Sequence, residues 1–116
     1  MSHSSVDNIM HMLIPLLRKD TSLFIMNNKS SSLVGFMIRH TNVEGWVANE
    51  NCGFHIEYYS RDINESKGHV PINHTEPLSP EKVVEHLLRF KYFHKKDIQR
   101  IELRNVDLSP VVVWRR

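Results

Sequence analysis

The sequence predicts an α+β fold in which two helices pack against a mainly antiparallel sheet of about five to six strands. Apolar residues recur with helical spacing in two segments, 5–19 and 80–93. Short apolar and aromatic runs separated by polar turns fill most of the remaining chain, in the order helix, three or four strands, helix, two strands. A length of 116 residues provides one hydrophobic core rather than two, so we expect a single domain over 1–116.

The first element is an amphipathic helix over about residues 5–19. Ser5 is a suitable N-cap for it. The residues that follow with spacings of three and four, and therefore share one stripe, are Val6, Ile9, Met10, Leu13 and Leu17. Pro15 lacks an amide donor and crowds the preceding turn, so we expect the helix to kink or tighten there.

Two strands, at 22–26 and 33–38, follow as a hairpin around a polar turn. Both are almost continuously apolar, which indicates that both of their faces are covered, at least partly by the two helices. Further strand is predicted at 46–48 and 54–59, interrupted near 51–53 by a turn or a bulge, which would extend an antiparallel meander.

Residues 60–78 predict a long loop, because they are polar, contain two prolines and sustain no period. Loops of this length are often contact surfaces. Ser79-Pro80-Glu81 then marks a helix start, with a capping hydroxyl, a proline at the first helical position and an acid near the positive helix end. This helix should run over 80–93.

The chain should end in two strands. Residues 101–104 alternate apolar and charged side chains, as a half-buried strand does. A turn at Ser109-Pro110 and a last strand at 111–114 follow.

The composition predicts a cytosolic protein that makes no membrane contact. Its longest apolar runs are far shorter than the roughly 20 residues of a membrane-spanning helix, and the N-terminus lacks an export signal. Cys52 is the single cysteine, so an internal disulfide is excluded. The net charge of +2 is too small to steer the whole chain towards nucleic acid or anionic lipid.

No motif predicts catalysis, a cofactor or a metal. The four glycines are scattered singly, which excludes a phosphate-binding loop. Cys52-x-x-His55 with His69 and His74 could supply zinc ligands, but structural zinc sites usually have two tight ligand pairs. His55 and Glu57 should lie on the same face of a strand within reach of one another, yet nothing supplies a nucleophile activated by this pair. We therefore expect no catalytic residues, no cofactor and no metal.

The features that remain are those of a binding surface. Residues 89–96 interleave cations with aromatic rings, a composition that suits phosphates and bases or an acidic protein, and the basic excess lies mostly within 89–104. The 89–104 segment, the strands at 46–59 and the loop at 60–78 should together provide the contact with a partner. The side chains that we expect to touch a partner are Trp46, Tyr58, Tyr59, Arg61, Asp62, Glu65, Lys67, Lys91, Lys95 and Lys96.

In its size, strand-rich α+β order, lack of catalytic residues and lack of an export signal, the chain resembles the small immunity proteins that bacteria make against contact-dependent growth inhibition and other polymorphic toxins. The resemblance covers the whole chain as a type and transfers no individual residue. It implies a cytoplasmic protein that binds its cognate toxin and blocks the toxin's active site. Many nuclease inhibitors of this kind are acidic, whereas this chain is mildly basic.

Two other binding functions stay open at this point. The chain is also similar to small secretion chaperones, although its basic balance and its missing third helix depart from them. The third hypothesis is a small RNA- or DNA-binding domain that uses the 89–104 segment.

Overall fold

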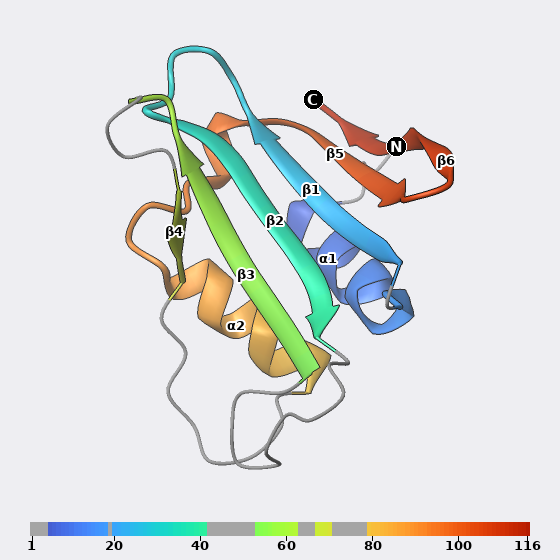
Figure 1. The fold of residues 1–116 in the computed structure, drawn as a ribbon. Helices are drawn as coiled ribbons and strands as arrows, with labels where there is room; N and C mark the ends of the chain where they lie inside the picture. Colours follow the sequence, from blue (N-terminus) through green and yellow to red (C-terminus); the bar gives the residue numbers. More distant parts are fainter. Residues whose placement is uncertain (1–4, 19, 42–52, 63–66, 71–78) are drawn as a thin grey trace.

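The computed structural model describes residues 5–18, 20–41, 53–62, 67–70 and 79–116. Within these ranges the chain forms a six-stranded antiparallel sheet in the order β4-β3-β2-β1-β5-β6, as Figure 1 shows. The helices are α1 (Val6–Leu13) and α2 (Pro80–Arg89), with short 3-10 turns at Ile14–Leu16 and Lys95–Asp97. The strands are β1 (Thr21–Asn27), β2 (Leu33–Thr41), β3 (Gly53–Ser60), β4 (Gly68–His69), β5 (Ile98–Asn105) and β6 (Leu108–Arg115). The predicted α+β class and element order are confirmed.

Helix α1 begins at the predicted serine cap but ends earlier than predicted. The Ser5 hydroxyl accepts a hydrogen bond from the Asn8 amide at 3.1 Å, which caps the first turn. Pro15 lies in the 3-10 turn that follows, so the helix tightens there as predicted and the helical path ends at Leu16 rather than at residue 19.

Strand β1 lies inside the sheet between β2 and β5. It pairs with β2 through the predicted hairpin and with β5 across a long stretch of sequence. Phe24, for example, faces Met37 of β2 on one side and Glu102 of β5 on the other. Residues that pair in this way share a face of the sheet.

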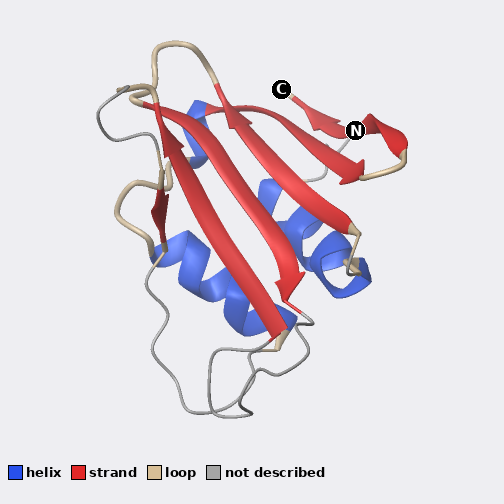
Figure 2. Cartoon of the chain, in the orientation of Figure 1, coloured by secondary structure: helices blue, strands red, loops and turns tan. Residues whose placement is uncertain are grey.

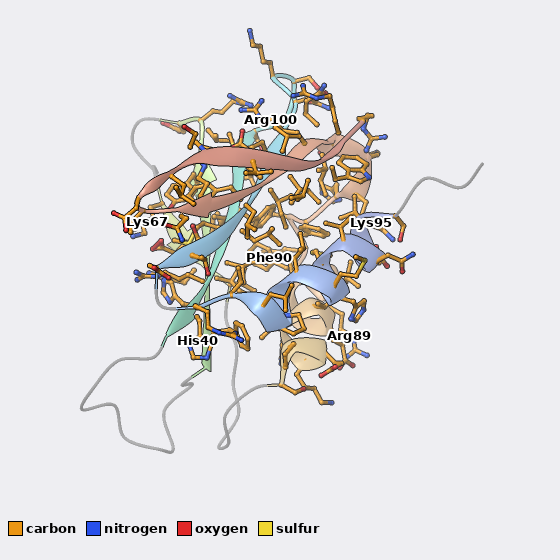
Figure 3. All side chains as sticks on the ribbon, turned by 90° about the vertical axis from the view of Figure 1, so that its right-hand side faces the viewer. His40, Lys67, Arg89, Phe90, Lys95 and Arg100 are labelled. Carbon is orange, nitrogen blue, oxygen red and sulfur yellow. The ribbon has the colours of Figure 1, made fainter. Side chains whose placement is uncertain are left out.

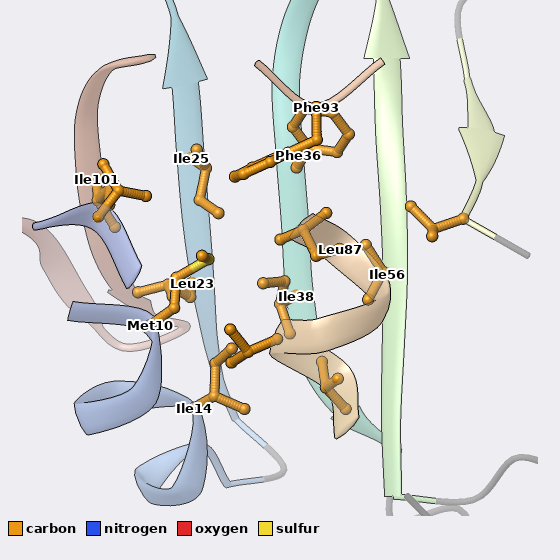
Figure 4. Packing of buried hydrophobic residues seen from close by; sticks show 14 of the residues in the cluster. Met10, Ile14, Leu23, Ile25, Phe36, Ile38, Ile56, Leu87, Phe93 and Ile101 are labelled. Atoms are coloured by element: carbon orange, nitrogen blue, oxygen red, sulfur yellow. The ribbon is translucent and has the colours of Figure 1, made fainter. Parts of the chain in front are cut away.

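Both helices lie on the same face of the sheet (Figures 1 and 2), and the core fills the space between the layers. Figure 4 shows Met10 from α1 and Leu87 from α2 packed against the strand side chains Leu23, Ile38 and Ile56. Within the described residues the two helices thus cover one face of β1 and β2, and the expected cover of both faces is not found. On the other face long side chains replace a helix, since the Arg104 guanidinium lies 3.8 Å from the centre of the Phe24 ring.

Helix α2 starts at the predicted Ser79 cap but ends at Arg89 rather than at residue 93. Phe90 has an extended backbone, and the amide of Phe93 bonds the carbonyl of Phe90 at 2.9 Å in a turn. Both rings pack against Phe36, with ring centroids 6.1 and 5.2 Å away. Both rings therefore pack into the core from the turn that follows the helix.

The last two strands begin earlier than predicted, at Ile98 and Leu108, and their turn lies at Val106-Asp107 rather than at Ser109-Pro110. Pro110 is part of β6, which is an edge strand of the sheet and so has one side that makes no ladder bonds. No helix in the part of the chain described here is long and apolar enough to cross a membrane.

The predicted strand at 46–48 and the turn at 51–53 lie mainly outside the described residues. Much of the predicted 60–78 loop also lies outside them. Its described part includes the short strand β4, which pairs with Glu57 and Tyr58 of β3.

Candidate binding surface on the open face of the sheet

The face of the sheet opposite the helices, here called the open face, has no second layer of helix or strand among the residues that the structure describes (Figure 1). Alternation along each strand and the cross-strand register define its members. They are Phe24, Met26, Met37, Arg39, His55, Glu57, Tyr59, His69, Arg100, Glu102, Arg104 and Val112. Apolar side chains occupy its middle strands and charged side chains lie towards both sides.

Glu102 is a buried carboxylate held between two arginines of the same strand. Its Oε2 accepts from Arg100 Nε at 2.6 Å, and its Oε1 accepts from Arg104 Nε at 2.9 Å. Its side chain is only 9% exposed, whereas each arginine side chain is 36% exposed. The hydrogen bond from Arg100 lowers the pKa of Glu102 most; burial opposes this, and Arg104 adds to the lowering.

Glu57 is a second buried carboxylate, with a side chain that is 4% exposed. The Lys67 ammonium contacts its Oε2, the Tyr59 hydroxyl donates to its Oε1 at 3.1 Å, and His55 Nε2 lies 3.3 Å from Oε2. Burial raises the pKa of Glu57, but hydrogen bonds from Lys67, His55 and Tyr59 outweigh it, so the pKa is lowered overall.

The pKa values of two neighbours of Glu57, His55 and Tyr59, are shifted as well. Burial lowers the pKa of His55, against the raising effect of the Glu57 carboxylate. Burial and the Glu57 charge together raise the pKa of Tyr59. The pair predicted from strand alternation, His55 and Glu57, is therefore in contact as expected.

The centre of the open face is apolar. A shallow hollow of about 410 Å³ lies there, between the two carboxylate clusters. Its lining includes Phe24, Met26, Val34, Gly35, Tyr59 and Arg104. Because the carboxylates of Glu57 and Glu102 lie beneath their cationic partners, a molecule approaching this face meets guanidinium and ammonium groups first. Arg39, which is solvent-exposed, adds a further positive charge.

Two of the side chains predicted to touch a partner, Tyr59 and Lys67, lie on this face. Lys67 also lines a second hollow, of about 790 Å³, together with three other predicted residues, Tyr58, Arg61 and Asp62. Arg61 stabilises the β1–β2 turn, because its guanidinium donates hydrogen bonds to the carbonyls of Ser31 and Asn28 at 2.8 and 2.9 Å. Tyr58 points to the helix side, against Phe36 and Phe90.

The other predicted residues lie elsewhere. Lys91, Lys95 and Lys96 lie on the connection between α2 and β5, and Lys95 pairs with Asp7 of α1 at 3.1 Å. Figure 3 views the sheet edge-on, with Lys67 on the open-face side and Arg89 and Lys95 on the helix side. Trp46 and Glu65 lie outside the described residues.

The rings of the 89–96 segment are not arranged as a stacking platform for bases. Phe93 is only 6% exposed, and Phe90 packs partly buried against the core, whereas Tyr92 is 45% exposed. The inward packing of these phenylalanines explains their spacing without a nucleic acid ligand.

The residues predicted individually to touch a partner do not include Phe24, Arg39, Arg100 or Arg104, although the predicted 89–104 contact segment contains the two arginines of β5. The alternation Arg100-Ile101-Glu102-Leu103-Arg104 indicates that the three charged side chains share one face of a strand. The sequence carries no signal that places this strand beside Phe24.

One group of side chains could hold a metal ion. His55, Glu57 and His69 offer ligand atoms that all lie within 4.8 Å of one another. Comparisons of the chain with protein-family models, with curated proteins and with solved structures find no match.

Proposed function

We propose that this chain is a non-enzymatic protein-binding module whose open face docks on an acidic surface of a partner protein, and that the partner is a bacterial toxin neutralised in the cytoplasm. The observation that supports the docking surface is the combination of an apolar hollow with ordered arginines on the sheet face opposite the two described helices. Arginine and aromatic side chains are the residues that contribute most at protein interfaces.

The fixed conformation of the arginine side chains favours binding of a folded partner. Arg100 and Arg104 are fixed by Glu102, and Arg104 also stacks on Phe24. Side chains that are already ordered lose less conformational entropy when a partner docks. Towards β6 the same face continues into Val112, which is 41% exposed and adds apolar contact area.

The positive charge of the open face favours an acidic partner. A cationic face complements acidic side chains, so it suits an acidic region of a toxin better than the basic groove in which a nuclease holds its substrate. Single-stranded nucleic acid is less well matched, because stacking needs free ring faces and Arg104 already covers one face of Phe24.

The test combines protection from the toxin with a charge reversal. The first toxin candidates come from two sources. One is the set of proteins encoded by neighbouring genes, and the other is the set of proteins that cross-link to the chain in its source cells. Each would be expressed with the wild type, with Arg39→Glu and with the matched reversal Lys82→Glu. Arg39 lies on the open face, whereas Lys82 is on α2 with a side chain 63% exposed.

We expect the wild type and Lys82→Glu to restore growth and to bind the toxin equally. Arg39→Glu should weaken binding by at least about tenfold, because it places like charges opposite each other. An equal loss of toxin binding in Arg39→Glu and Lys82→Glu would show that the contact does not depend specifically on the open face. Purification with RNA alone, with affinity that falls steeply with salt, would transfer the function to nucleic acid.

A further inference from the structure

The edge of the open face at β3 and β4 brings two histidines and a glutamate together. His55 and Glu57 are two residues apart on β3 and so share a face, and His69 of β4 is the register partner of Glu57. The rings of His55 and His69 have centroids 4.8 Å apart, and the potential ligand atoms of all three side chains lie within 4.8 Å of one another.

The three side chains differ in their exposure to solvent. Glu57 has a side chain 4% exposed and that of His55 is 23% exposed, while His69 is exposed at the sheet edge. The Nε2 atom of His55 is buried and faces Oε2 of Glu57 at 3.3 Å. An imidazole nitrogen that lies beside a carboxylate oxygen in this way can bind the same ion as the carboxylate.

We propose that His55, Glu57 and His69 form a binding site for a divalent transition-metal ion, with zinc as the ion that suits them best. Two imidazoles and one carboxylate are ligands that zinc accepts, and a site with three protein ligands leaves a fourth position for water. The sequence predicts no metal, because these ligands do not fall into the two tight pairs along the chain that structural zinc sites usually have. This inference does not rest on the proposed protein-binding function.

The surroundings of Glu57 support this arrangement. The Tyr59 hydroxyl bonds Oε1 at 3.1 Å, which orients the carboxylate and leaves Oε2 directed at His55. Lys67 contacts the same Oε2, so in the absence of metal its ammonium supplies the neutralising charge. Its side chain is 50% exposed, and its long flexible stem can turn into solvent when an ion takes its place. Metal and Lys67 therefore compete for one oxygen.

This competition provides a sharp test on the full chain. After treatment with a chelator, Zn²⁺ binding would be measured by calorimetry, and Co²⁺ binding by its visible absorption. We expect one ion per chain. His69→Ala should weaken binding at least about tenfold, because it removes a ligand. The control His94→Ala, an exposed histidine outside the cluster, should leave binding unchanged.

Lys67→Met should tighten binding, because it removes the competitor, while Lys91→Met should have no effect. The rise in Tm on adding Zn²⁺ should follow the same ranking, since an ion that binds the folded chain stabilises it. Equal weakening by His69→Ala and His94→Ala would show binding by scattered histidines and overturn the proposal. So would a Lys67→Met variant that binds Zn²⁺ no more tightly than the wild type.

Discussion

Replacing Glu102 by glutamine should destabilise the fold by about 1–2 kcal/mol at neutral pH. The substitution keeps the volume of the side chain but removes the charge that two guanidiniums approach at 2.6 and 2.8 Å. Removing one partner of a fully buried ion pair costs about 3–5 kcal/mol. Here the carboxylate is buried but each arginine side chain is 36% exposed, so water screens part of the interaction and the expected loss is smaller.

The loss should depend on pH in a defined direction. The pKa of Glu102 in the folded chain is lowered from its ordinary value of 4.5, chiefly by the hydrogen bond from Arg100. The carboxylate therefore contributes its full stabilisation above pH 4.5, and this is lost as the pH falls through the lowered pKa of the folded state. The wild type and Glu102→Gln should have different stabilities at neutral pH and converge in acid, because other carboxyl groups titrate alike in both proteins.

Urea unfolding of both proteins from neutral pH down to about pH 3 measures this difference, with stability obtained by linear extrapolation. Glu85→Gln is the matched control. Glu85 also contacts two cations, Lys82 at 3.5 Å and Arg89 at 3.2 Å, but its side chain is 42% exposed. Its loss should stay below about 0.5 kcal/mol. Equal losses for the two variants, or a loss for Glu102→Gln that persists in acid, would refute the reasoning from burial.

Two further predictions concern the packing that supports the open face. Phe36→Ala should cost about 3–5 kcal/mol in urea unfolding, because the ring is 1% exposed and packs against two other phenylalanines; a loss below about 1 kcal/mol would contradict its place in the core. Gly35→Ala should cost about 1–3 kcal/mol, because the added methyl would collide with the backbone carbonyl of Ile25 on the neighbouring strand. A neutral result would show that these two strands lie further apart than described.

The sequence predicted the elements that local signals define. Ser5 and Ser79 mark the two helix starts, and Pro15 marks the tightening at the end of α1. The first hairpin and the shared face of His55 and Glu57 also follow from spacing along the chain. Capping bonds, proline geometry and strand alternation act over a few residues, so they can be read without knowledge of the fold.

The early end of α2 is different, because it depends on where Phe90 and Phe93 find space. The chain is extended at Phe90, directly after the helix ends at Arg89, and both rings contact Phe36 in this conformation. Burial of aromatic surface in the core outweighs local propensity at this point.

The open face was likewise decided by the tertiary structure. Phe24 and Arg104 are distant in sequence and meet because β1 pairs with β5, and His69 reaches His55 because β4 adds to the edge of β3. Apolar strands alone do not show which face the helices will cover. Strand pairing is chosen by the whole core at once, so the sequence determined which side chains share a strand face, while only the folded sheet determined which of those faces join into one surface.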